Sequence, residues 1–143
     1  MLIGQYTGRL NLKRRVAIPK KFIQKLGNRP IMAKWYENCL VLVSNEGWKE
    51  LLKRIGSSQK LMIAPVRDID RFVSGSAFEL EADIQGRVII PDILSKFAGL
   101  GEEVVFLGLG DRVEVWNRET WEAKETKIMD EAKAALEEIA KNE

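Results

Sequence analysis

The hydrophobic and polar positions of this chain repeat with an offset of 72 residues. The stretch that begins at Tyr6, YTGRLNLKRRVAIPKKFIQKLG, and the stretch that begins at Phe78, FELEADIQGRVIIPDILSKFAG, have the same order of features. Each has an alternating segment, a polar loop, a β-branched run, a proline, a short helical pattern and a glycine. After one inserted residue the match continues to Trp48 and Trp121, which are expected to be core residues. Self-similarity over this length indicates an internal duplication.

Each copy predicts the same series of elements. In the first copy we expect strands at 6–10 and 16–18, a helix at 20–26 and a hairpin with Glu37-Asn38 at its tip. In the second copy we expect strands at 78–82 and 88–90, a helix at 92–98 and a hairpin that turns at Gly110-Asp111. The proline after each short strand suits the first turn of a helix, and the glycine after each helix suits a left-handed cap. The predicted apolar faces of these helices are Phe22, Ile23 and Leu26, and Ile93, Leu94 and Phe97.

The pattern outside these stretches predicts further helices at 48–55, 65–73 and 119–141, with N-caps at Ser44 and Asn117 and a break at 56–59. The predicted fold class is α+β, a pseudo-twofold tandem repeat of strand–short helix–β-hairpin units. The expected boundaries are 5–47 for the first repeat, 48–76 for a helical connector, 77–120 for the second repeat and 121–143 for a C-terminal helix. Three fates of the last helix stay open: packing on the body, contact with a neighbouring subunit, or fraying.

The charged residues are unevenly distributed. Residues 1–36 carry nine Lys or Arg and no Asp or Glu, although the whole chain has 23 basic and 21 acidic residues. A cationic segment in a nearly neutral chain indicates a polyanionic partner. The alternative is a basic face that only keeps the protein in solution.

The residue content argues against an enzyme. With no histidine and a single cysteine, Cys39, the chain lacks an imidazole base, a Cys–His pair and a cysteine zinc site. We therefore expect no catalytic site, no metal, no cofactor and no small-molecule substrate. Cys39 lies in an apolar run and is expected to be a buried, reduced thiol. The sequence has no long apolar stretch and no signal-peptide pattern, so we expect a cytoplasmic protein without a membrane partner.

Candidate DNA-contacting residues lie in and around the polar loops, which are NLKRR at 11–15 and DIQGR at 83–87. Consecutive long cations are rarely buried, so Lys13 and Arg14 are expected to be exposed. Basic side chains neutralise phosphates, and an arginine can also bind guanine O6 and N7 with two hydrogen bonds. The full candidate set is Arg9, Lys13, Arg14, Arg15, Lys20, Gln85 and Arg87.

Asn11 and Asp83 are the candidates for orienting these loops. Asp83 is spaced to pair with Arg87, which would make that arginine part of the loop architecture rather than a DNA contact. The two roles are compatible, because an acid can orient an arginine that also faces DNA. Asn11 keeps an oxygen for hydrogen bonds to its loop but carries no charge, so Arg15 is expected to be less neutralised than Arg87.

The run ADIQGRVIIP, the short helix after it and the hairpin that ends in VEVWNRETW resemble the MraZ family. Members of that family carry two AbrB-type swapped-hairpin units, each with a D-x-x-x-R motif, which is intact at Asp83 to Arg87 and altered at Asn11 to Arg15. The resemblance implies a nucleoid-associated transcriptional regulator of the division and cell-wall gene cluster. It also implies a ring-shaped homo-oligomer that binds short repeated motifs in double-stranded DNA through Arg15 and Arg87.

Two other classes of function stay open. An antitoxin-like protein of related fold would bind DNA and wrap a toxin with a disordered tail, whereas the tail of this chain is predicted to be helical. A structural assembly protein would have no affinity for DNA. An RNA partner is less favoured, because the basic segment lacks evident aromatic platforms.

Overall fold

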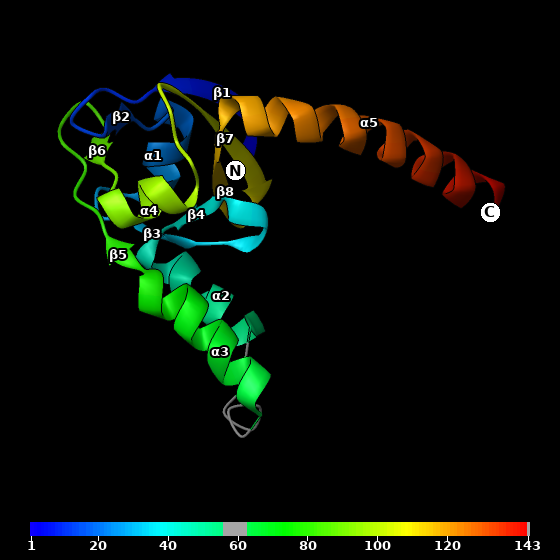
Figure 1. Cartoon of the computed structure of the whole chain (residues 1–143), viewed down its shortest axis with the longest axis horizontal. Coiled ribbons are helices and arrows are strands. Elements are labelled where there is room, and N and C mark those ends of the chain that lie inside the picture. The colour runs from blue at the N-terminus through cyan, green and yellow to red at the C-terminus, as the bar shows by residue number, and fades with distance from the viewer. Residues whose placement is uncertain (56–62, 143) are drawn as a thin grey trace.

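The computed structural model describes residues 1–55 and 63–142, which form a mixed α+β fold (Figure 1). The strands in this part of the chain are β1 (Leu2–Arg9), β2 (Arg15–Ala17), β3 (Ile31–Lys34), β4 (Leu40–Val43), β5 (Phe78–Glu79), β6 (Arg87–Ile89), β7 (Glu103–Gly110) and β8 (Val113–Asn117). The α-helices are α1 (Lys20–Leu26), α2 (Asn45–Ile55), α3 (Ala64–Val73), α4 (Asp92–Phe97) and α5 (Arg118–Lys141). The predicted fold class, α+β, is confirmed at this level.

The two copies of the repeat share their sheets. A six-stranded antiparallel sheet has the order β1-β7-β8-β4-β3-β5, and a separate two-stranded ribbon pairs β2 with β6. β1 of the first copy pairs with β7 of the second, and β5 of the second copy pairs with β3 of the first. β4 and β8 meet between these pairs. Exchanging the two copies leaves the strand order unchanged, so each copy supplies strands that the other needs.

The six-stranded sheet is covered on both faces, because alternating side chains enter two apolar cores. The first core joins the sheet to the ribbon and to helices α1 and α4 through the buried side chains Val16, Val88, Phe22 and Leu94. The second core joins the opposite face to helices α2, α3 and α5 through Leu51, Val73 and Trp121. Every residue of β4 is buried, which explains its continuous apolar sequence LVLV.

The predicted hairpin turns and side-chain N-caps are present, and the glycines after α1 and α4 have positive φ angles, but Gly27, with ψ 179°, is not in the predicted left-handed helical conformation. Glu37 and Asn38 both have positive φ angles at the tip of the first hairpin. In the second hairpin, the Leu109 N–H donates to the Arg112 carbonyl at 2.9 Å across the predicted turn. The helix N-caps also form, since the side chains of residues 44 and 117 accept backbone N–H groups three residues later at 2.9 and 3.0 Å.

Several strand limits differ from the predicted ones. β1 begins at Leu2 instead of residue 6, because β7 offers it a partner along its whole length. β5 has only two paired residues, and the chain after it bonds instead to the loop before β3, where the Leu80 N–H donates to the Pro30 carbonyl at 2.8 Å. The short strands lie at 15–17 and 87–89, one residue earlier than expected. The predicted break at 56–59 lies outside the described residues.

One predicted core residue is wrong. Ile93 is 56% exposed, whereas its neighbour Leu94 is fully buried. Leu94 and Ala98 are four residues apart and together face the first core, which turns Ile93 toward the outer side of α4. The equivalent position in α1 is Lys21, an exposed cation.

Helix α5 leaves the body after its first turns (Figure 1). Trp121 is 6% exposed in the second core, and Lys124 forms an ion pair with Glu37. From Thr126 to Asn142, every residue is exposed. The apolar side chains of Met129, Leu136 and Ile139 are 65%, 67% and 59% exposed within this single chain.

The close approach of β1 and β7 at Gly108 gives a test of this topology. A Cβ added to Gly108 would lie 2.8 Å from backbone atoms of Leu2 and Ile3. Since those atoms belong to a paired strand, Gly108→Ala should lower the free energy of unfolding by about 2 kcal/mol or more. Gly75→Ala is the control, because nothing lies within 4 Å of its Cβ position, and it should change stability by less than about 0.5 kcal/mol. Urea denaturation measures both, and equal stability of the two variants would refute this strand pairing.

Candidate nucleic-acid interface

The loops before β2 and β6 have the same hydrogen-bonded turn. In the first loop, Asn11 Oδ1 accepts hydrogen bonds from the backbone N–H groups of Lys13 and Arg15, each at 2.9 Å. In the second loop, Asp83 Oδ1 accepts from the backbone two and four residues later, also at 2.9 Å each. A backbone bond from the same residue to the carbonyl four positions later closes each turn, at 3.1 and 3.0 Å. The side chains at 11 and 83 thus fix the shape of their loops.

The second oxygen of Asp83 makes the loops electrostatically different. Arg87 Nε donates to Asp83 Oδ2 at 2.9 Å, whereas Asn11 has no charge to offer Arg15. The backbone N–H of Arg87 is the main cause that lowers the pKa of Asp83, and the guanidinium lowers this pKa further. Both side chains of the pair are about two-fifths exposed, so the pair orients Arg87 more than it stabilises the fold.

The ribbon of β2 and β6 brings the two loop arginines onto one surface. Val16 and Val88 lie opposite each other in the ribbon, and both are 1% exposed. Because side chains alternate along a strand, Arg15 and Arg87 point to the other side of the ribbon, away from the core. The register makes Arg15 and Arg87 diagonal neighbours across the ribbon. Residues in this relation are typically roughly 7–8 Å apart. Residues separated by 72 positions in the sequence thus share one outward face.

Two backbone hydrogen bonds, one for each loop, fasten the loops to the opposite copy. The Ile18 N–H donates to the Gly86 carbonyl at 3.0 Å, and the Ile90 N–H donates to the Arg14 carbonyl at 2.8 Å. Each bond joins the end of a short strand to the loop of the other repeat. The two loops are therefore held in a fixed relation to each other.

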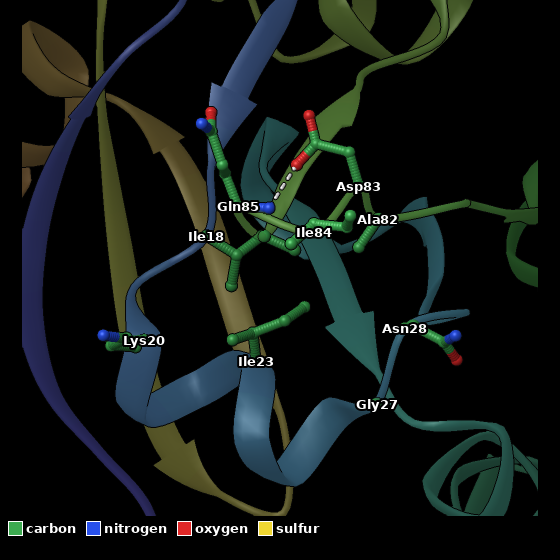
Figure 2. Close-up of a pocket in the computed structure, with 10 residues that line it drawn as sticks. Ile18, Lys20, Ile23, Gly27, Asn28, Ala82, Asp83, Ile84 and Gln85 are labelled. Carbon is green, nitrogen blue, oxygen red and sulfur yellow. Dashed lines mark hydrogen bonds between the residues drawn. The ribbon is translucent and has the colours of Figure 1, made fainter.

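Arg14 differs from its predicted state, because its side chain is only partly exposed. Its Nε donates to the Ile90 carbonyl at 3.1 Å, and its guanidinium lies 3.7 Å from Asp92 at the start of α4. The equivalent residue, Gly86, also has positive φ but lacks a side chain. Beside Gly86, a hollow of about 770 Å³ lies between the second loop and α1, and Ile18 borders this hollow (Figure 2). The side chain of Arg14 therefore connects the first loop to the second copy, and the second loop has no equivalent side chain.

The other predicted cations surround the ribbon. Lys20 borders both the hollow in Figure 2 and a second hollow, which Arg9 and Lys21 also line. Arg9, Lys13 and Lys20 are exposed, and Gln85 lies at the exposed tip of the second loop. Within residues 1–55 and 63–142, the ion pairs of the basic segment involve only Arg14 and Arg29. The structure thus brings Lys20 and Gln85 to the border of one hollow, and Lys20 and Arg9 to the border of the other.

Sequence reasoning missed some exposed residues of this surface. Ala17 and Ile89 lie on the outer face of the ribbon beside the arginines. Leu12 and Ile84, at the loop tips, are fully exposed. Strand alternation relative to the buried valines would have found the first pair, and the turn pattern around residues 11 and 83 would have found the second.

Comparison with known proteins identifies the family of this chain. Residues 74–142 match the family model described as "MraZ protein, putative antitoxin-like". The transcriptional regulator MraZ of Caldanaerobacter subterraneus subsp. tengcongensis is 36% identical over 144 residues, which cover 99% of this chain and 96% of the relative. The corresponding regulator of Bifidobacterium longum is 34% identical over 97% of this chain and 95% of its own length. That of Acetivibrio thermocellus is 39% identical over 86% of this chain and 85% of its own length. This chain belongs to the MraZ family.

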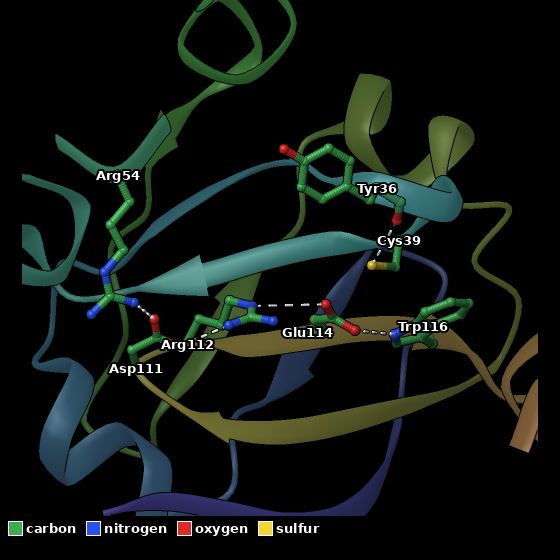
Figure 3. Close-up of polar contacts among 7 residues, drawn as sticks. All are labelled: Tyr36, Cys39, Arg54, Asp111, Arg112, Glu114 and Trp116. Carbon is green, nitrogen blue, oxygen red and sulfur yellow. Dashed lines mark hydrogen bonds and ion pairs between the residues drawn. The ribbon is translucent and has the colours of Figure 1, made fainter. Parts of the chain in front are cut away.

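The one cysteine of this MraZ-family chain is unsuited to chemistry. Cys39 is fully buried, and its Sγ donates to the Tyr36 carbonyl at 3.2 Å (Figure 3). Burial raises the pKa of the thiol strongly, and the nearby Glu114 carboxylate raises it further. Glu114 itself accepts a hydrogen bond from Trp116 Nε1 at 2.9 Å. Because the thiolate is the nucleophilic form, a protonated and enclosed Cys39 has a packing role.

Two further features are absent from the part of the MraZ-family chain that the structure describes. No cluster of three or more histidine, cysteine or acidic side chains there has the arrangement of a metal site. None of the helices described has the length and apolarity needed to cross a membrane.

The hydrogen bonds of Asp83 predict how this MraZ-family loop responds to pH. The carboxyl should titrate below its ordinary pKa of 3.8. The hydrogen bonds to the ionised carboxylate stabilise the loop, and this stabilisation is fully present above the ordinary pKa of 3.8. It is lost as the pH falls through the lowered pKa of the folded protein. Arg87→Ala should raise the pKa of Asp83 only part of the way, because the two backbone N–H donors remain. Carbon NMR of the side-chain carboxyl measures both proteins, and a normal or raised pKa in the parent would contradict the turn.

Proposed function

We propose that this chain is a sequence-specific DNA-binding transcriptional regulator that meets duplex DNA with the outer face of the β2–β6 ribbon and the adjoining loops. The observation that carries the proposal is the register that makes Arg15 and Arg87 outward diagonal neighbours. The major groove admits a two-stranded ribbon, and arginine can bind guanine with two hydrogen bonds. The family membership supports the same function, because the curated relatives bear the name transcriptional regulator.

The proposed roles follow from exposure and pairing. Arg15 and Arg87 contact base edges, and Gln85 adds a polar contact beside them. Arg9, Lys13 and Lys20 neutralise phosphates and position the protein without selecting a sequence. Arg14 is assigned a positioning role, because its side chain is bonded to the other repeat.

The family resemblance adds proposals about context. We infer that the fold is of the AbrB-type swapped-hairpin kind, and that the protein acts in the cytoplasm on short repeated motifs near the division and cell-wall genes. We also infer a homo-oligomer, which fits the exposed apolar side chains of α5, including Leu136 and Ile139. Several copies on one ring would multiply weak contacts with repeated DNA sites through a high effective concentration.

The test is binding to the duplex upstream of the protein's own gene, measured by fluorescence anisotropy at several salt concentrations against a scrambled competitor. Lys13→Ala should reduce the slope of log affinity against log salt by about one. Arg15→Ala and Arg87→Ala should each cost about 1–3 kcal/mol on the specific duplex and much less on the competitor. The control is the triple variant Lys127→Ala, Lys133→Ala, Lys141→Ala, which removes three exposed charges from α5.

Two outcomes would reject the assignment. Binding that is insensitive to the loop variants would place the interface elsewhere, and absence of any binding by the parent would favour a structural assembly protein. Circular dichroism and light scattering check that the variants keep the fold and the oligomer.

The difference between Asn11 and Asp83 gives a finer prediction. Asn11→Asp should create a second carboxylate–arginine pair, because Asp83 already makes one in the same turn geometry. The added charge offsets Arg15, so binding to competitor DNA should weaken and the salt slope should fall by up to about one. The same anisotropy titration measures both effects. An unchanged slope would mean that the side chain at position 11 does not act on Arg15.

A further inference from the structure

We propose that Leu12 and Ile84 contact the 5-methyl groups of thymines in the major groove. This inference rests on the proposed DNA-binding function and adds a second kind of base contact to it. Each loop tip would recognise a T·A pair, and that pair would lie beside the base that the arginine of the same loop contacts.

The first observation is that the two loop tips carry large aliphatic side chains with no cover. Leu12 and Ile84 are both fully exposed, and they occupy equivalent positions in the two repeats. The loops differ at the next two positions, where Lys13 and Arg14 correspond to Gln85 and Gly86. An aliphatic tip is thus common to two loops whose other exposed positions differ.

The second observation is that the tips are held rigidly. Each tip directly follows the residue whose side-chain oxygen accepts two backbone N–H groups of the loop, at 2.9 Å in all four bonds. The loops are also bonded to the opposite repeat through the carbonyls of residues 14 and 86. A rigid turn cannot bury its tip by folding back, so each aliphatic side chain is presented to a partner.

The surroundings favour DNA over a second copy of the chain as that partner. Lys13 and Arg15 follow the first tip in the sequence, and Gln85 and Arg87 follow the second. Protein–protein interfaces are depleted of lysine at their cores, whereas phosphates attract such cations. Within the major groove, the thymine methyl group is the apolar feature that distinguishes thymine from the other bases. An aliphatic tip with an arginine three residues later, and in the first loop a lysine directly after it, matches that surface.

The experiment combines a protein change with a DNA change. The parent and the double variant Leu12→Ala, Ile84→Ala are titrated with the duplex upstream of the gene, prepared once with thymine and once with uracil, which lacks the methyl group. Ile3→Ala, which changes an exposed aliphatic residue on β1 outside both proposed interfaces, is the matched control. Replacing thymine by uracil should weaken the parent and the control by about fourfold for each methyl group contacted, from about 0.8 kcal/mol per buried carbon at 1.4 kcal/mol per tenfold.

The double variant should bind the thymine duplex about as weakly as the parent binds the uracil duplex, and it should not distinguish the two duplexes. Equal discrimination by the parent and the double variant overturns the inference while leaving the proposed function intact. A change in oligomer mass of the double variant, measured by light scattering, also overturns it, because the tips would then contact another subunit. If the parent binds neither duplex, the proposed function fails and the inference fails with it.

Discussion

The pairing of β2 with β6 determines how the two loop arginines are arranged on the surface of this protein. It is short, but it joins segments 72 residues apart and buries a valine from each repeat between the ribbon and the first core. The register sends the two arginines outward together, and crossed backbone bonds fix each loop against the opposite repeat. A one-residue slip would turn the valines outward and the arginines into the core, so the cost of exposing apolar surface and burying charge enforces the register.

The loops of the two repeats have the same hydrogen-bonded turn but differ in their electrostatics. Asn11 and Asp83 make the same turn, yet only Asp83 adds a carboxylate that pairs with the loop arginine. Arg14 fills the space beside α4, whereas Gly86 leaves a hollow beside α1. The molecule therefore presents two loops of equal shape and unequal charge. On the proposed function, one loop contributes more to salt-dependent attraction and the other more to oriented contact.

Local patterns were sufficient to predict most elements of the fold. The prolines, glycines and caps predicted the short helices and the turns, because each of these residues acts within a few positions of itself. The exchange of strands between repeats depends on contacts across the whole chain, so the extended β1 and the shortened β5 were not predicted. Exposure of Arg14 was expected from its charge, but the carbonyl of Ile90 and the carboxylate of Asp92 lie close to it only in the folded chain. Ile93 was misassigned because two helical faces were compatible with so short an apolar pattern.

If both loops lie against one DNA duplex, cysteine-directed cleavage should reveal their position on it. Cys39 is buried, so a cysteine placed at Lys13, at Gln85 or, as a control, at Glu137 on α5 is the reactive thiol for an iron-chelate reagent that cuts nearby DNA. We expect strand cuts from both loop positions at neighbouring sites on the upstream duplex, and few or none from α5. Cuts from α5 with none from either loop, in labelled proteins that still bind, would contradict this placement of the loops.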